Sequence, residues 1–191
     1  MLIKIVTMKT LFAICMSIMA GLAVAQTDYY TGRQTFVVNG QTYRITNRDY
    51  SLWIYNSKNT RDVSAPVLDS QGNPMNPNAF QAYYLVWPVK DGSVERAFRE
   101  TFTEAEINDF KSSEEKIRIY YTVNPSGKAY EVTIRMLKHP KLLAIEPEKL
   151  YLLEQKLKQY VTFTIREENR QSPFLRSMTF MEFKDLAIDT Q

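Results

Sequence analysis

Histidine and cysteine are almost missing from this sequence, which contains one of each, His139 and Cys15. A zinc site normally needs several His or Cys ligands. A Ser-His-Asp or Cys-His arrangement needs its histidine beside an activated nucleophile, and the chain has no G-x-S-x-G motif. We therefore predict no metal site and no catalytic residue, and we interpret His139, which precedes Pro140 at the end of an expected strand, as a surface residue.

Glycine is also scarce, and charge of one sign does not dominate. The 6 glycines are isolated, so no glycine-rich phosphate loop is present and we expect no cofactor. Lys and Arg number 24 against 21 Asp and Glu, without a long basic block, which argues against a nucleic-acid partner. The apolar share of 45% is that of an ordinary globular protein, large enough to bury a core without metals or disulfides.

The first 25 residues have the layout of a secretory signal peptide. Lys4 and Lys9 form a basic start, Leu11 to Ala20 form an apolar stretch, and Ala23-Val24-Ala25 is an A-x-A cleavage site. Met8 is an alternative start, and a lipid anchor on Cys15 is a less favoured alternative because Ile14 precedes it. Cleavage near Ala25/Gln26 would place the protein in the periplasm or outside the cell, with no integral membrane span in the mature chain.

Removal of this segment changes the chemistry of the mature chain. It removes Cys15, the only cysteine, so disulfides and thiol catalysis are excluded. It also removes Lys4 and Lys9, which brings the formal net charge of +3 closer to zero.

Residues 26–100 are expected to form a β-rich stretch. Asn39-Gly40 between two β-rich runs predicts a tight hairpin, because both turn residues must accept a positive φ. Strands are predicted over 50–55 and 80–89, the second ending near Pro88. The segment 57–79 between them is dense in Pro, Asn, Asp and Gly, and so long a connection is either functional or mobile.

Residues 101–191 are expected to form an α+β stretch, which either shares one core with 26–100 or has its own. Residues 93–111 predict helix in two pieces, with a strand as the alternative for the first piece and the second beginning at a Thr103–Glu106 capping box. The alternating run 117–123, the turn 124–127 and the returning strand after it predict a second hairpin. One face of the returning strand is expected to carry Tyr130, Val132, Ile134 and Met136. A helix from Pro147 and strands at 161–165 and 178–183 follow. The predicted fold class is therefore α+β: antiparallel sheets from hairpins with one or two helices on one face, and a C-terminal β-β-α-β-β unit.

Residues 115–165 resemble the C-terminal domain of TonB-type energy transducers. The hairpin I-R-I-Y-Y-T-V-N-P-S-G-K-A-Y-E-V-T-I and the helix and strand L-L-E-Q-K-L-K-Q-Y-V-T-F carry the resemblance. The proline-rich spacer of a transducer is missing. The whole chain is similar to the small secreted proteins of unknown function of Gram-negative bacteria, so the resemblance implies a fold and a compartment and no activity.

Candidate acidic sites have simpler explanations. The segment from Asp69 to Asn73 is similar to a calcium loop but lacks its second acidic residue and closing Glu, so we interpret it as a turn. Carboxylate pairs can make a glycosidase, but adjacent glutamates say nothing of a separation across a cleft. We assign these pairs to helix capping or solvated loops: Glu104/Glu106, Glu114/Glu115 and Glu167/Glu168.

Aromatic residues are the remaining candidates for a binding surface: Trp53, Tyr55, Tyr83, Tyr84 and Trp87. We expect most of these rings to lie in the core, with an exposed platform as the alternative.

Three hypotheses follow. The first is an exported, non-enzymatic binding protein of the periplasm or cell envelope, which docks an envelope protein on strand edges of its two hairpins. The second is a carbohydrate-binding accessory protein that uses aromatics near the 57–79 loop. The third is a glycoside hydrolase-like enzyme with a carboxylate pair that the sequence does not reveal.

Overall fold

The computed structural model of this protein describes residues 27–62, 66, 68–69, 71–74, 86–112 and 115–186. The predicted signal peptide lies outside these residues. The strands are β1 (Thr35–Val38), β2 (Gln41–Asn47), β3 (Ser51–Asn56), β4 (Val86–Pro88), β5 (Lys116–Val123), β6 (Ala129–Leu137), β7 (Phe163–Ile165) and β8 (Leu175–Glu182). The helices are α3 (Ser93–Arg99), α4 (Glu104–Lys111), α5 (Pro140–Leu143) and α6 (Pro147–Tyr160), with short 3-10 turns η1 (Glu167–Asn169) and η2 (Phe183–Asp185).

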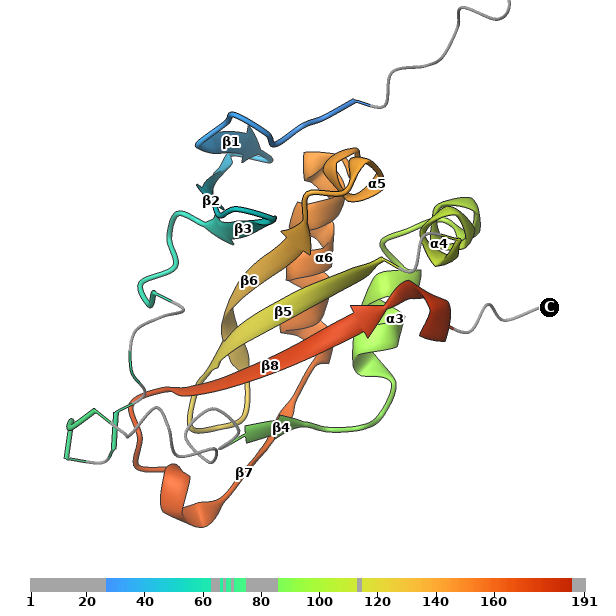
Figure 1. Cartoon of the computed structure of the whole chain (residues 1–191). Coiled ribbons are helices and arrows are strands. Elements are labelled where there is room, and N and C mark those ends of the chain that lie inside the picture. The colour runs from blue at the N-terminus through green and yellow to red at the C-terminus, as the bar shows by residue number, and fades with distance from the viewer. Residues whose placement is uncertain are drawn as a thin grey trace, which may run out of the picture.

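A six-stranded antiparallel sheet in the order β1-β2-β3-β6-β5-β8 forms the body of the fold (Figure 1). The predicted hairpin at Asn39-Gly40 is confirmed, and both residues have the positive φ, 48° and 69°, that its turn requires. The pairing of β3 with β6 joins the predicted stretches 26–100 and 101–191, and one hydrophobic cluster contains residues of both. The predicted α+β fold class is therefore confirmed.

The second hairpin, β5–β6, is also confirmed, but Tyr130 lies on the other face of β6 from the one predicted. Val123 pairs with Ala129, whereas Thr122 pairs with Glu131, so Tyr130 is the extra residue of a β-bulge. The bulge shifts the alternation of β6 by one position, and Tyr130 is exposed while Ala129 is buried. The prediction that Tyr130 shares a face with Val132, Ile134 and Met136 was therefore wrong, since those three side chains are buried.

A two-stranded sheet, β4–β7, lies against the turn of the second hairpin. Of the strand predicted over 80–89, the described part is β4. Gly127, with φ 85°, lies so close to β7 that an added Cβ would be 2.4 Å from the carbonyl oxygen of Phe163. Glycine is therefore required there both for its conformation and for its size.

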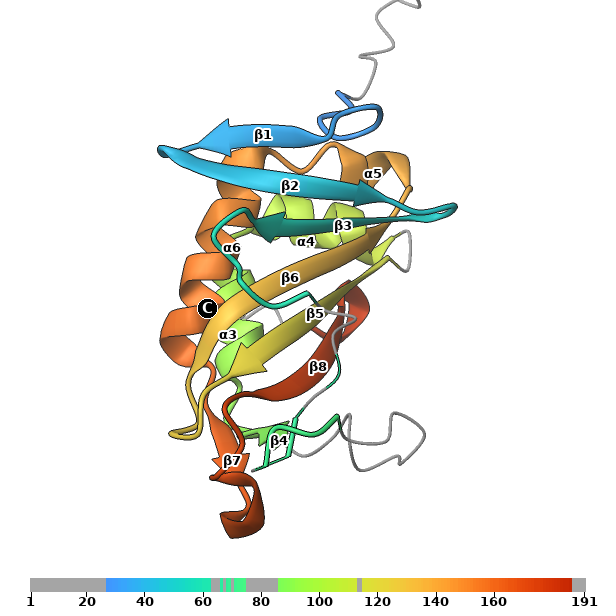
Figure 2. The ribbon, with the colours of Figure 1, turned by 90° about the vertical axis from the view of Figure 1, so that its left-hand side faces the viewer.

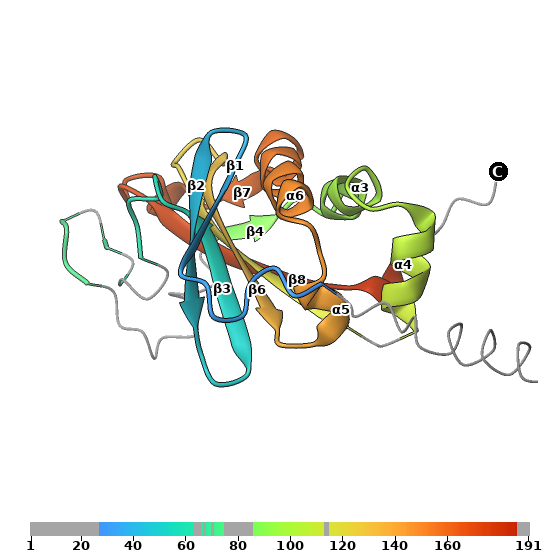
Figure 3. The same ribbon diagram turned by 90° about the horizontal axis from the view of Figure 1, so that it is seen from above.

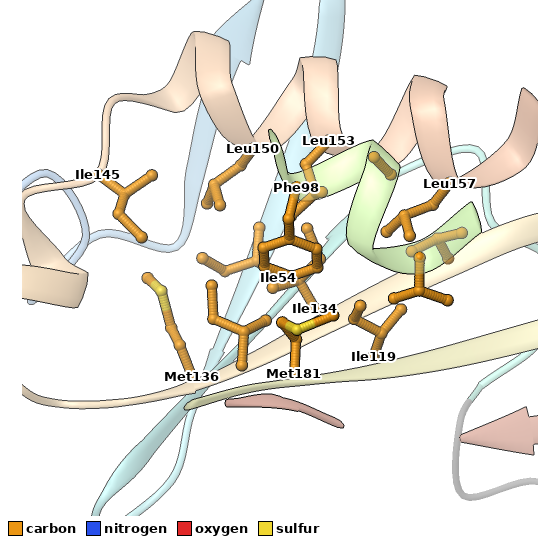
Figure 4. Packing of buried hydrophobic residues seen from close by; sticks show 14 of the residues in the cluster. Ile54, Phe98, Ile119, Ile134, Met136, Ile145, Leu150, Leu153, Leu157 and Met181 are labelled. Atoms are coloured by element: carbon orange, nitrogen blue, oxygen red, sulfur yellow. The ribbon is translucent and has the colours of Figure 1, made fainter. Parts of the chain in front are cut away.

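The described helices α3 to α6 lie on one face of the six-stranded sheet (Figures 2 and 3). The stripe predicted on α6 is confirmed: Leu150, Leu153 and Leu157 are fully buried and point at the sheet, where Ile54 and Ile134 meet them (Figure 4). Full burial of such a side chain contributes about 1.5–3 kcal/mol. This helical layer therefore provides much of the hydrophobic stabilisation.

The shorter helices have their own anchors in this layer. The predicted capping box of α4 is present, since Thr103 and Glu106 hydrogen-bond each other's backbone N–H. Behind it, Phe102 and Phe110 pack on Phe183 of η2, with ring centroids 5.8 and 4.5 Å away. The cap and the ring cluster fix α4 against the end of β8.

One carboxylate is buried between the sheet and α6. Glu154 is 1% exposed and accepts hydrogen bonds from the Tyr43 hydroxyl of β2 and from the Lys158 ammonium one turn further along the helix. Burial and the adjacent carboxylate raise the pKa of Tyr43 well above its usual range, so the phenol stays a hydrogen-bond donor. This cluster ties the first hairpin to α6.

Candidate binding groove on the open face of the sheet

The opposite face of the six-stranded sheet carries no helix in the part of the chain described, and Figure 2 views it directly. Because side chains alternate along a strand, Leu52 and Ile54 enter the core while Trp53 and Tyr55 lie on this open face. Trp53 and Tyr55 are half-buried. The prediction that such rings are core was therefore wrong for these two, because their neighbours already fill the inner face.

Residues 57–62, which we call the strap, leave β3 and pass over the open face in front of β6 (Figure 2). The Asn59 side chain donates to the Val132 carbonyl at 3.0 Å. Thr60 donates to the carboxylate of Glu131 from its backbone N–H at 2.5 Å and from its hydroxyl at 2.9 Å. The strap thus forms one wall above the sheet and buries Glu131 beneath it.

A groove of about 640 Å³ lies between the strap, the sheet and the β2–β3 turn. Its lining combines aromatic rings, arginines, amides and hydroxyls: Arg44, Thr46, Arg48, Asp49, Tyr50, Ser51, Trp53, Tyr55, Asn59, Thr60, Arg61, Asp62, Thr133 and Arg135. A second depression of about 620 Å³ adjoins it and shares Arg44, Thr46 and Tyr55, extending the surface along β2 toward Arg33.

The floor of the groove is fixed by stacked side chains. Trp53 of β3 reaches across β6 and stacks on Tyr120 of β5, with ring centroids 4.8 Å apart and planes 24° apart. The Arg135 guanidinium lies 5.4 Å from the Trp53 ring and donates to the Ser51 hydroxyl at 3.2 Å. These contacts hold the arginine in place, and a preorganised donor binds a ligand with less loss of side-chain freedom.

The other predicted aromatic candidates do not join this groove. Trp87 is 52% exposed on β4, in the separate two-stranded sheet, so the expectation of a core position was wrong for it as well. Tyr83 and Tyr84 lie outside the described residues.

The acidic candidates show ordinary structural roles where they are described. The Asp69 carboxylate accepts hydrogen bonds at 2.8 Å from the backbone N–H of Gln71 and of Asn73, the pattern of a local turn. Glu106 caps α4, and the exposed Glu167 pairs with Arg170. Glu114 and the Glu168 side chain lie outside the described residues.

His139 lies at the N-terminus of α5, where its Nδ1 is 3.4 Å from Oε1 of Glu115. Within the described ranges, no group of three His, Cys, Asp or Glu side chains is placed to hold a metal ion. None of the described helices is both long and apolar enough to cross a membrane.

The predicted docking edges of the second hairpin are occupied. β6 pairs with β3 and β5 pairs with β8, so both hairpin strands are internal to the sheet. The prediction that this hairpin offers a free edge was wrong, because its outer hydrogen-bonding groups are satisfied by strands distant in the sequence. Among the described elements of this sheet, only β1 and β8 pair on one side alone.

Comparison with solved structures finds a protein of similar fold from Bacteroides uniformis. The chain is similar to a DUF5043 family protein from Bacteroides uniformis ATCC 8492, with a TM-score of 0.69, 17% identity, and coverage of 83% of this chain and 95% of that chain. No protein-family model and no curated protein matches the sequence. The likeness shows the fold, shared with a domain of unknown function, while the TonB resemblance stays a prediction.

Sequence reasoning missed most of the groove. It singled out Trp53 and Tyr55 but not Tyr120. The rings of Trp53 and Tyr120 meet across β6 because β3 and β5 both pair with that strand, and these pairings link segments distant in the sequence. It also missed the arginines on the outer positions of β2 and β6. Alternation alone could have placed Arg44 opposite the buried Tyr43 and Ile45, since that signal is local to the strand.

Proposed function

We propose that this chain is an exported, non-enzymatic binding protein whose ligand occupies the groove on the open face of the sheet. The observation that carries this is the fixed position of Trp53 and Arg135 in a groove walled by the strap, with Tyr120 stacked on the Trp53 ring. The helical face uses its apolar side chains for the core, whereas these rings and donors face outward.

Carbohydrate is the ligand class that this lining favours. Sugar rings present C–H faces that pack on aromatic rings, and hydroxyls that pair with amides and guanidinium groups. The groove supplies these groups together, from Trp53 and Tyr55 on the floor to Asn59 and Thr60 on the strap. Its lining carboxylates are Asp49 and Asp62. We propose binding rather than hydrolysis, and a cleavage measurement tests this choice.

The two tryptophans of the chain provide a matched test. Binding of residues 26–191 to a panel of neutral and charged oligosaccharides would be measured on an array and then by calorimetry. We expect Trp53→Ala to weaken binding about tenfold or more, and Trp87→Ala, outside the groove, to leave it unchanged. Equal effects of the two substitutions would contradict the groove as the site, and a bound oligosaccharide found cleaved by mass spectrometry would contradict a non-enzymatic role.

Export is tested separately. The full chain would be expressed in a Gram-negative host and fractionated. The proposal expects periplasmic or secreted protein that begins at Gln26 by mass spectrometry. Protein retained in the cytoplasm with an intact N-terminus would contradict it.

A further inference from the structure

Two arginines stand directly opposite each other in the middle of the open face. Arg118 of β5 is the cross-strand partner of Arg135 of β6. Like charges in this relation destabilise a sheet. Neither side chain forms an ion pair with an acidic residue in the described part of the chain, and both are half-buried. An anion between the two guanidinium groups would remove this repulsion.

Aromatic rings flank the arginine pair along the same cross-strand row. Trp53 is the partner of Arg135 on one side, and Phe180, 59% exposed, is the partner of Arg118 on the other. The row across β3, β6, β5 and β8 therefore reads ring, guanidinium, guanidinium, ring. Such a row offers flat apolar contact on both sides of an anion-binding centre.

The adjoining depressions extend the positive surface. Their basic lining residues, among those described, are all arginine: Arg33, Arg44, Arg48, Arg61 and Arg135. The acidic lining residues are Asp49 and Asp62. Arg44 and Arg48 are exposed and make no ion pair with a described residue. Arginine binds carboxylate and sulfate groups through two parallel hydrogen bonds, which lysine does not.

From this charge complementarity we infer that the ligand is an acidic oligosaccharide, with one carboxylate or sulfate held by Arg118 and Arg135 and further sugar units lying over the rings and toward Arg44. This inference rests on the proposed function and adds the charge and extent of the ligand. The two adjoining depressions suit an oligomer rather than a single sugar. The aromatic flanks and the Asn59 amide of the strap favour a sugar over a strand of nucleic acid.

The test uses defined probes on the mature protein, residues 26–191. Calorimetry would compare a galacturonic acid hexamer, its fully methyl-esterified form, a chondroitin sulfate hexamer and single-stranded hexathymidylate. We expect at least one acidic sugar to bind, and the neutral ester and the DNA to bind about tenfold more weakly or worse. Binding of the galacturonic acid hexamer would show that a carboxylate is sufficient. Binding of the chondroitin sulfate hexamer alone would point to its sulfate groups, because both of these sugars carry carboxylates.

Substitutions then assign the binding to the arginine pair. Arg118→Gln and Arg135→Gln should each weaken binding of the acidic sugar about tenfold. Arg99→Gln on α3 removes the same charge from the helical side and should leave binding of the acidic sugar unchanged. Thermal unfolding adds a second measurement: Arg118→Gln should not lower the melting temperature of the free protein, but should reduce its rise on adding the sugar.

Each adverse outcome has its own meaning. Equal binding of the ester and the acid, dependent on Trp53, would overturn the acidic ligand but leave the carbohydrate-binding function standing. Binding of no sugar at all would overturn both. Binding of the DNA as tightly as the sugars, or insensitivity to both arginine substitutions, would overturn the assignment to an acidic oligosaccharide at this pair.

Discussion

The two faces of the six-stranded sheet differ in what their side chains contact. On the helical face, apolar side chains meet α6, and two lysines of that helix pair with glutamates, as Lys149–Glu106 and Lys156–Glu100. On the open face, rings and arginines line a groove, and Arg118 and Arg135 oppose each other without an acidic partner among the described residues. The sheet thus separates the residues that stabilise the fold from those that we propose bind a ligand.

This separation has a physical consequence for mutagenesis. Substitutions on the helical face should change the free energy of unfolding, and substitutions on the open face should change binding with little effect on unfolding. We expect the largest change in stability from substitutions under α6 and smaller changes from substitutions of charged residues.

The largest effect is expected inside the helical layer. Leu153→Ala leaves a cavity under α6 and should lower the free energy of unfolding by about 2–5 kcal/mol, measured by denaturant titration. Leu152, the preceding residue, is 38% exposed, and Leu152→Ala should change the unfolding free energy by no more than about 0.5 kcal/mol. Equal losses in the two variants would mean that α6 does not pack as described.

The next effect concerns the buried carboxylate. Tyr43→Phe removes the hydroxyl that donates to Glu154 and should cost about 1.5–3 kcal/mol of unfolding free energy. Tyr50 is 70% exposed at the rim of the groove, so Tyr50→Phe serves as the control and should leave the stability unchanged. An unfolding free energy of Tyr43→Phe equal to that of the unsubstituted protein would show that the first hairpin does not depend on this hydrogen bond.

On the open face we expect a substitution that increases the unfolding free energy rather than decreasing it. Arg118→Gln removes one of two opposed charges and should raise the unfolding free energy of the ligand-free protein by about 0.2–1 kcal/mol. The gain should shrink in high salt, which screens the repulsion. A clear loss of stability would show instead that Arg118 supports the fold.

The smallest effect is a pH dependence on the helical side. Hydrogen bonds from Lys156, Arg96 and Tyr160 lower the pKa of Glu100 from 4.5 to about 2. A carboxylate whose pKa is lowered by folding stabilises the protein fully above its unfolded pKa, and this contribution is lost as the pH falls through the folded pKa. Unfolding free energy measured between pH 5 and pH 2 should therefore decline less steeply in Glu100→Gln than in the unsubstituted protein. Parallel curves would contradict this role of Glu100.

Local patterns predicted the helical face well. The spacing of Leu150, Leu153 and Leu157, the capping box at Thr103 and the turn at Asn39 each depend on a few neighbouring residues, and each is confirmed. Such features follow from helix and turn geometry without knowledge of the rest of the fold.

The groove could not be predicted in the same way, because it depends on pairings between distant segments. Trp53 meets Tyr120 and Arg135 only through the pairing of β3 with β6, and the bulge that turns Tyr130 outward has no local signal in the sequence. Alternation along β3 predicts that Trp53 and Tyr55 share one face. Which face of the strand is the core depends on the side chains of the segments packed against it, and these are distant in the sequence.

The fluorescence of a single tryptophan tests the central claim most directly. The chain has 2 tryptophans, so Trp87→Phe leaves Trp53 as the only reporter of the mature protein, and Trp53→Phe leaves Trp87. Titration with the acidic oligosaccharide should give a saturable change in emission from Trp53 and none from Trp87. A saturable change from Trp87 alone would contradict the account, because the ligand would then bind away from the open face of the six-stranded sheet.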